Sequence, residues 1–559
     1  MSERASRVSK GALQFMQGAV LAALLAAGCS PVELTEHSAN QIVVGLPLEP
    51  LGFYPLRSLD SGSYYAQTLV FEGLLRYDAN MRIVPGVCSD YDVSDDGLTY
   101  TLKLRSGLRF SDGQPVTIGD VLASIALAQS KFSPYKGDYE AIATVENPDA
   151  DTIVLHLTKP STPLLARLVE LRLLPKRIID TPDHGRDALS RHPVGVGPFV
   201  LSAWESGLEL DFNRNPYYWG EKPQYEKLVW RVIPDKTLAA LALRRGELDV
   251  AQLDAATWTA MNGRQSRSQA NVPENQSESS PGNAGSHEPI EVESFPGTRT
   301  VYVGFNTNKT PFSEELVRQA IGLSIDRSQL VKGLYGGYGV VPQSDVPAGN
   351  WAYNANVKHW TYDPELAKAT LEKAGYQFRD KFWRSAKTGE SLAFRILTLR
   401  DYQDVASVVA DDLRRIGITA EVQIMEYATL RQRYLSKGLF ETMVWSRSSG
   451  PDPECSLVWG SGGALNYSRF NLPEMDRLIA LGKAETDRQA RKKIYGKIQS
   501  ILADELPWVF LVQPELLIAH QSDITNVKQA HQSMTGLPWD NPLFNAAQWR
   551  RLKVQRHSD

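Results

Sequence analysis

The alternation of hydrophobic and polar residues predicts strands along much of the chain. Residues 99–105 place apolar side chains on one face and polar side chains on the other, which is the period-2 pattern of a half-buried strand. Turns at Asp96-Gly97 and at residues 111–113 bound this strand, and Thr117 is placed to cap a helix that follows. Residues 301–305 repeat the alternation. We therefore expect sheets that pack one face against a core.

Helical periodicity lies between the predicted strands of the second half. Residues 394–421 predict a strand, a helix that ends at Gly417 and a second strand, and such a βαβ unit has parallel strands with a right-handed crossover. Asp363-Pro364 begins another helix, and residues 473–504 predict a helical pair. Residues 508–520 predict the last strong strand. This mixture of strands and helices favours an α/β fold.

Composition indicates an ordinary globular protein. The 559 residues have room for about three domains. Hydrophobic residues make up 42%, charged residues make up 22% and the net charge is -4, with no basic stripe, so we do not expect nucleic-acid binding. Polar residues, Pro and Gly replace nearly all large apolar residues at positions 261–289, where we predict a disordered insertion, with a functional lid as the alternative.

The N-terminus carries a secretion pattern. A basic start precedes an apolar run at residues 19–27 that is too short to span a membrane as a stable helix. The small residues that end on Cys29 resemble a bacterial lipobox, although Ala26 stands where Leu is usual. We predict a signal peptide over residues 1–28, acylation of Cys29 and a linker to residue 39; a plain secreted precursor is the alternative. The predicted location is the periplasm, with a lipid anchor in the cytoplasmic or the outer membrane.

Motifs for catalysis or for metal binding are not found in the sequence. It contains no GxSxG elbow, no HExxH, no phosphate-binding loop and no GxGxxG after a strand. The nine His lack ligand spacing, so we expect no enzyme activity, no cofactor and no metal. Cys88 and Cys455 could pair in an oxidising compartment or lie buried as small apolar residues, and the sequence leaves both alternatives open.

The sequence DGLTYTLKLRSGLRFSDGQPVTIGDV, which ends at Val121, resembles the signature of the bacterial extracellular solute-binding proteins of family 5. This family serves ABC importers for peptides, oligopeptides and nickel. The resemblance implies a two-lobed α/β fold of the periplasmic-binding-protein type (class II, cluster C), with an extra subdomain on the first lobe. It also implies a monomer that captures an oligopeptide or peptide-like solute in a cleft between the lobes and delivers it to an ABC permease and its ATPase.

The resemblance also divides the chain into parts. The expected parts are the first lobe at residues 40–72, 195–300 and 510–550, the subdomain at 73–194, the second lobe at 301–509 and a tail at 551–559. We expect the signature itself to be scaffold within the subdomain, without ligand contact.

The main candidate site is the loop after the strand that ends near Trp445. In the resembling proteins an Asp of this loop receives the α-ammonium of the peptide, and its position here falls at Ser448 or Ser449, so that carboxylate is missing. The ligand would then lack a free amino terminus, bind with another polarity, or use another acid such as Asp60. Arg447 would favour an acidic ligand group, unless it faces solvent. The candidates from this loop are Trp445, Ser446, Arg447, Ser448, Ser449 and Asp452, the last of which is alternatively a turn former.

Other candidates come from positions where the family lines its pocket. They are Asp60, Ser61, Tyr64, Trp351, Arg400 and Tyr402. Trp351 could equally be a core residue, and Arg400 could pair a carboxylate. Two other functions remain open: binding of a metal chelate or small organic solute on the same fold, and a periplasmic sensor or chaperone role.

Overall fold

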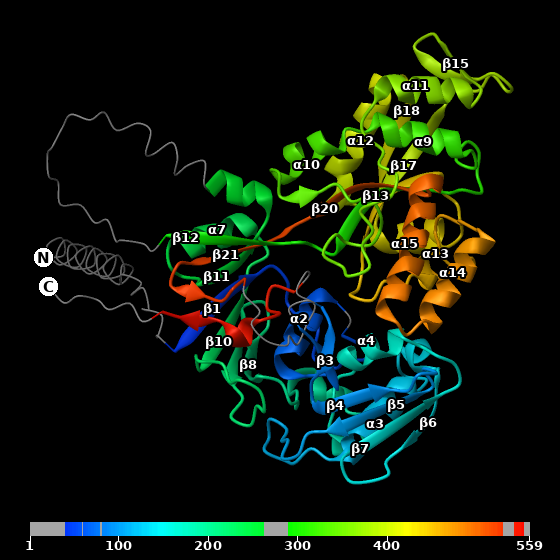
Figure 1. Cartoon of the computed structure of the whole chain (residues 1–559). Coiled ribbons are helices and arrows are strands. Elements are labelled where there is room, and N and C mark those ends of the chain that lie inside the picture. The colour runs from blue at the N-terminus through cyan, green and yellow to red at the C-terminus, as the bar shows by residue number, and fades with distance from the viewer. Residues whose placement is uncertain (1–39, 59, 79–80, 262–288, 529–540, 553–559) are drawn as a thin grey trace, which may run out of the picture. The chain divides into compact units, whose positions relative to one another are not determined.

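The computed structural model describes residues 40–58, 60–78, 81–261, 289–528 and 541–552, all within one compact unit. The predicted signal peptide, Cys29, the linker and nearly all of the predicted insertion and tail lie outside these residues. The described chain forms three main sheets, of seven, six and four strands (Figure 1). None of the helices in this described part has both the length and the apolar character needed to cross a membrane.

The seven-stranded sheet forms the first lobe. In spatial order its strands are β12 (Ile290–Phe295), β21 (Leu516–Gln521), β11 (Val250–Leu253), β1 (Gln41–Leu46), β10 (Lys227–Val232), β9 (Glu209–Arg214) and β8 (Phe199–Glu205). β1 runs parallel to β10 and β11, whereas the other neighbours are antiparallel. Its helices α2 (Ser61–Val70) and α7 (Lys236–Arg244) are capped by the side chains of Asp60 and Asp235.

The four-stranded sheet forms the subdomain. Its strands are β4 (Cys88–Val93), β5 (Thr99–Leu104), β7 (Thr152–Leu157) and β6 (Ile142–Glu146), preceded by the hairpin β2 (Leu75–Tyr77) and β3 (Ile83–Pro85). The helices are α3 (Ile118–Gln129), α4 (Pro163–Glu170), α5 (Lys176–Ile179) and α6 (Arg186–Arg191), with the short η1 (Lys136–Tyr139). The strand predicted from alternation is confirmed as β5, and Thr117 caps α3 in a capping box with Asp120. One core cluster includes side chains of both the subdomain and the first lobe.

The six-stranded sheet forms the second lobe, with core clusters of its own. Its strands are β14 (Gly339–Val340), β20 (Trp508–Pro514), β13 (Arg299–Phe305), β19 (Thr442–Ser448), β17 (Ala393–Thr398) and β18 (Thr419–Ile424). Its helices are α9 (Glu315–Ser324), α10 (Arg327–Tyr335), α11 (Pro364–Lys373), α12 (Gln403–Arg415), α13 (Ser456–Trp459), α14 (Pro473–Ala484) and α15 (Arg488–Glu505). The predicted βαβ unit is confirmed, because β17 and β18 are parallel and α12 connects them.

The described chain also contains smaller elements. They are the hairpin β15 (Tyr376–Arg379) and β16 (Phe382–Ser385), the pair β22 (Ile524–Thr525) and β23 (Arg550–Arg551), and the short helices η2 (Arg400–Tyr402), η3 (Thr429–Leu435) and η4 (Ala546–Gln548).

Two segments connect the lobes: residues 296–298, between β12 and β13, and Glu515, between β20 and β21. The single strand predicted at residues 508–520 is therefore two strands in two sheets, and β20 stays in the second lobe as far as Pro514. The segments approach closely, because a Cβ added to Gly297 would lie far inside contact distance of the Pro514 carbonyl oxygen. The Gln513 side-chain amide also donates to the Gly297 carbonyl. We call this crossing the hinge.

Candidate functional site

A cavity of about 470 Å³ lies between the subdomain and a loop of the second lobe. Tyr64 and Gln67 of α2 contribute from the first lobe. The cavity size is in the range of sites for small molecules, which are commonly about 300–1,000 Å³. The loop consists of residues 447–454, of which the first two are the last residues of β19, and we call it the 447–454 loop.

The subdomain wall combines aromatic and charged side chains. Among those that line the cavity are Tyr77, Tyr135, Tyr139, Arg167, Glu170 and Arg172. Arg167 projects from α4 and lies 3.2 Å (Nε to Oδ2) from Asp138, while its carbonyl accepts from the Tyr139 hydroxyl at 2.9 Å. These contacts hold η1, and with it Tyr139, against α4.

Two polar atoms of this wall are buried without a hydrogen-bond partner among the described residues: Nη1 of Arg172 and the hydroxyl of Tyr77. The Arg172 side chain is 4% exposed, and its Nη2 lies 3.5 Å from Oε2 of Glu170. Burial raises the pKa of Tyr77 well above its usual range, and the charges of Glu170 and Asp452 add to the effect, so this hydroxyl keeps its proton. Leaving such donors unpaired costs about 1–3 kcal/mol each, so the wall is poised to donate hydrogen bonds.

The second-lobe wall is built differently, because its charges are paired inside the lobe. Arg447 Nη1 donates to Oδ2 of Asp345 at 2.9 Å, and the indole of Trp459 donates to the same oxygen at 2.5 Å. The Ser449 hydroxyl donates to the Asp345 carbonyl at 2.7 Å, and its amide donates to the Thr298 carbonyl at 3.1 Å. The 447–454 loop is thereby fastened to the hinge.

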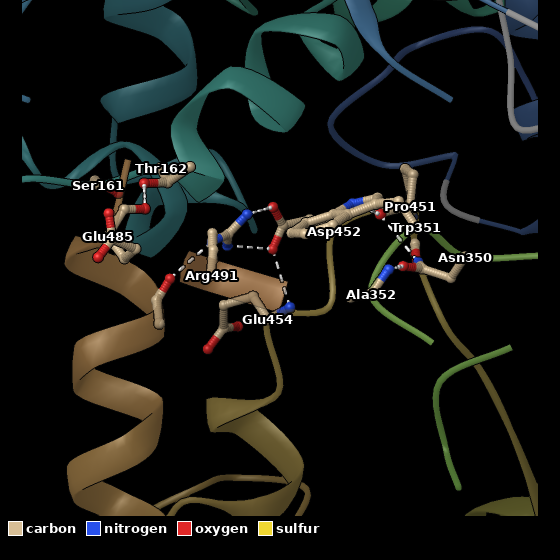
Figure 2. Close-up of polar contacts among 12 residues, drawn as sticks. Ser161, Thr162, Asn350, Trp351, Ala352, Pro451, Asp452, Glu454, Glu485 and Arg491 are labelled. Carbon is tan, nitrogen blue, oxygen red and sulfur yellow. Dashed lines mark hydrogen bonds and ion pairs between the residues drawn. The ribbon is translucent and has the colours of Figure 1, made fainter. Parts of the chain in front are cut away.

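Asp452 forms a bidentate ion pair with Arg491 of α15 (Figure 2). Arg491 Nη1 and Nη2 donate to the two carboxylate oxygens at 2.6 and 2.8 Å. The amide of Glu454 donates to Asp452 Oδ1 at 2.9 Å, and the Glu454 carboxylate accepts from the Ser456 amide and lies 3.5 Å from the Lys483 ammonium. Both carboxylates of the loop therefore have cationic partners within the second lobe.

A direct contact also joins the subdomain to the second lobe beside the cavity. Thr162 precedes α4; its amide donates to the Lys483 carbonyl at 3.1 Å, and its hydroxyl donates to the Glu485 carbonyl at 2.6 Å (Figure 2). The N-terminus of α4 thus meets the C-terminal end of α14, where helix dipoles attract. These hydrogen bonds hold the subdomain against the second lobe beside the cavity.

The predicted site residues divide into three groups. Those that line the cavity are Tyr64, Arg447, Ser448 and Asp452. Ser449 and Trp351 support the 447–454 loop: the Trp351 indole donates to the Pro451 carbonyl at 3.2 Å and lines a neighbouring cavity of about 210 Å³. The third group neither lines the main cavity nor supports the 447–454 loop. It consists of Asp60, Ser61, Arg400, Tyr402, Trp445 and Ser446.

Local contacts occupy four residues of this last group. The Asp60 carboxylate accepts from the amide and the hydroxyl of Ser63 at 2.8 and 2.6 Å, as the cap of α2. Tyr402 and Ser446 hydrogen-bond to each other at 2.5 Å, and Trp445 stacks on Tyr427 with ring centroids 5.8 Å apart. Arg400 is exposed.

Sequence reasoning missed most of the subdomain wall. One signal was present: Arg167, Glu170 and Arg172 interrupt the otherwise apolar residues 163–174, and charged side chains that must fold into such a run are rarely buried without a function. Among the described residues, no cluster of three or more His, Cys, Asp or Glu is arranged to hold a metal ion. Cys88 and Cys455 are both buried and free, and burial raises the pKa of Cys88 to about 12.

Comparison with known proteins identifies the family to which this chain belongs. Residues 82–468 match the profile described as bacterial extracellular solute-binding proteins, family 5 Middle. The chain belongs to this family. The expected recognition and the two-lobed fold are thereby confirmed, and this family member is the solute-binding component of an ABC importer.

Relatives in the family carry different ligands in their names. Heme-binding protein A of Haemophilus influenzae is 27% identical, over 85% of this chain and 88% of its own. The dipeptide-binding protein of Escherichia coli is 25% identical, over 90% of this chain and 94% of its own. Among solved structures, the periplasmic binding protein DppA of Helicobacter pylori, in complex with the peptide STSA, is 26% identical with a TM-score of 0.69, covering 90% of this chain and 97% of that one. The family is therefore shown, and the solute is the question that remains for this site.

Proposed function

We propose that this family member binds a short peptide or peptide-like solute in the 470 Å³ cavity and presents it to the permease. The observation that carries this proposal is the cavity itself, which is lined by both lobes, with tyrosines and paired charges on opposite walls. A solute of a few residues would fill such a volume and would make polar contacts along its backbone. The names of the dipeptide-binding relative and of the peptide complex are consistent with this class of solute.

Closure around the solute provides the signal to the permease. In the open form the walls separate about the hinge, and the solute binds first to one wall; closing then forms the Thr162 contacts with α14. Because the 447–454 loop is tied to the hinge through Ser449 and Thr298, loop position and lobe angle change together. We also propose that acylated Cys29 anchors the mature chain, as a monomer, to a membrane beside the importer.

Mass spectrometry of the solute released from the purified protein tests the proposal. We expect peptide-like molecules of about two to four residues, which match the cavity volume. Metal analysis of the same sample is the control for a chelate. Recovery of a metal chelate or of a non-peptide organic molecule, with no peptide bound, would contradict the proposal. Labelling with a radioactive fatty acid, compared between the wild type and Cys29→Ser, tests the anchor, and equal labelling would contradict it.

A further inference from the structure

The two unpaired donors of the subdomain wall carry a more specific inference. As whole residues, Arg172 is 6% exposed and Tyr77 is 2% exposed, and both line the cavity. Since buried polar groups are nearly always hydrogen-bonded, unpaired donors on residues that line a cavity are candidates for hydrogen bonds to a ligand. A guanidinium with a free Nη1 fits a carboxylate better than it fits a neutral carbonyl, because the hydrogen bond is charge-assisted.

The other cations of the cavity wall are already engaged. Arg447 is paired with Asp345 at 2.9 Å and Arg167 with Asp138 at 3.2 Å. The ion-pair partner of Arg172 is Glu170, at 3.5 Å through Nη2, and its guanidinium also lies over the Tyr64 ring, 5.5 Å from the centroid. Among the cations that line the described cavity, Arg172 therefore has the weakest ion pair and the largest capacity for an added anion.

The carboxylates of the second-lobe wall are arranged the opposite way. Asp452 is saturated by Arg491, and Glu454 is held by the Ser456 amide and by Lys483. Since Ser448 and Ser449 are neutral, the 447–454 loop does not offer a free carboxylate to an ammonium group. Recognition of charge in this cavity therefore falls to the subdomain wall.

The geometry points to an acid-binding subsite in which Arg172 Nη1 holds the carboxylate of the solute and the Tyr77 hydroxyl donates a second hydrogen bond to the solute. The solute is thus a peptide-like acid whose acidic end faces the subdomain. This inference rests on the proposed function. Beyond that function, it gives the orientation of the bound solute and names Arg172 as the residue that discriminates acids from amides.

Matched peptide pools test the subsite. One pool contains N-acetyl dipeptides with varied side chains and free C-terminal carboxylates, and the second contains the same dipeptides as C-terminal amides. Thermal-shift and native mass-spectrometric titrations compare the two pools on one protein. We expect the acid pool to bind the wild type at least about tenfold more tightly, since a charge-assisted hydrogen bond is lost in the amide.

Variants then locate the discrimination. Arg172→Gln should bind both pools about equally, whereas Arg172→Lys should keep part of the preference for acids. Tyr77→Phe should weaken the binding of both pools by a few fold, because it removes only a neutral donor. Arg186→Gln is the matched control in the same subdomain, since Arg186 pairs with Asp187 on the surface away from the cavity, and it should keep the full preference. If Arg172→Gln does not fold, the comparison of acid and amide pools on the wild type and on Arg172→Lys still tests the subsite.

The outcomes separate this inference from the proposed function. Equal binding of acids and amides by the wild type, or an unchanged preference in Arg172→Gln, would overturn the subsite and leave a peptide-like solute in place. Tighter binding of a third pool, of dipeptide amides with free amino groups, would also overturn it and would point to Glu170 as the recognition group. Binding of none of the three pools would overturn the proposed function and the subsite together.

Discussion

The two walls of the cavity differ in how their charges are satisfied. On the second-lobe wall, Arg447, Asp452 and Glu454 each have a partner in the same lobe. On the subdomain wall, Arg172 Nη1 and the Tyr77 hydroxyl are buried without partners among the described residues. In the proposed site, the first wall is complete before a solute arrives, whereas the solute completes the second. We therefore propose that the second lobe sets the shape of the binding site and that the subdomain sets its specificity for the solute.

The strongest way to break the second-lobe wall is Asp452→Asn. The Arg491 side chain is 3% exposed and would keep its charge with only one neutral acceptor in place of two ionised oxygens. Breaking a buried ion pair costs about 3–5 kcal/mol of unfolding free energy, to be measured by urea denaturation. Glu474→Gln in the exposed pair with Arg477 is the control and should change stability by less than about 1 kcal/mol. Equal losses of unfolding free energy in the two variants would show that the Asp452–Arg491 pair contributes no more to stability than an exposed pair.

Gly297→Ala tests whether the hinge sets the position of that wall. The added Cβ would meet the Pro514 carbonyl, which belongs to the other hinge strand, so we expect a loss of about 1–3 kcal/mol in stability and a more open form by small-angle X-ray scattering. Gly333→Ala in α10 is the control, because its Cβ would meet no atom within 4 Å. An unchanged scattering profile for Gly297→Ala would show that the hinge tolerates a side chain.

Arg447→Ala and Arg400→Ala compare a lining residue with an exposed one. Removal of Arg447 leaves the carboxylate of Asp345 without its cation beside the cavity and loosens the 447–454 loop, so we expect the co-purified solute to bind about tenfold more weakly, a loss of about 1.4 kcal/mol. Arg400→Ala should leave the affinity within about twofold. Calorimetric titration of both variants measures the difference, and equal, negligible losses would remove Arg447 from the site.

The smallest effect is expected where the two walls meet directly. Thr162→Val keeps the shape of the side chain but removes the hydrogen bond to the Glu485 carbonyl, which costs about 0.5–1.5 kcal/mol and should weaken solute binding by a few fold. Thr158→Val removes a hydroxyl that bonds to Ala141 within the subdomain, and it should leave affinity unchanged. Fluorescence titration compares the two, and equal affinities would show that the contact does not stabilise the closed form.

The fold could be predicted where short-range patterns decide it. Alternation located β5, capping residues located α3 and α11, and the crossover rule fixed β17 and β18 as parallel. The strand predicted at residues 508–520 was wrong as a single element, because its two halves find partners in different sheets. Only tertiary pairing determines that division.

The site was predicted in part, from the resemblance and not from local chemistry. It led to the 447–454 loop, but the subdomain wall remained hidden because Tyr77, Tyr135 and Arg172 come together only through packing of β2, η1 and the segment after α4. Asp60 shows the opposite case: a carboxylate chosen for ligand binding caps α2, because Ser63 offers two nearby donors. Local hydrogen bonds can engage a candidate before any ligand does.

The insertion of β21 between β11 and β12 affects how the protein is made. The Gln521 side-chain amide donates to the Leu243 carbonyl at 2.6 Å across 278 positions of sequence, and β20 completes the other sheet only a few residues earlier. A nascent chain emerging from the ribosome therefore lacks the last strands of both sheets until synthesis is almost finished. Because loop-closure entropy opposes such long-range pairing, both sheets are completed late and folding is slow.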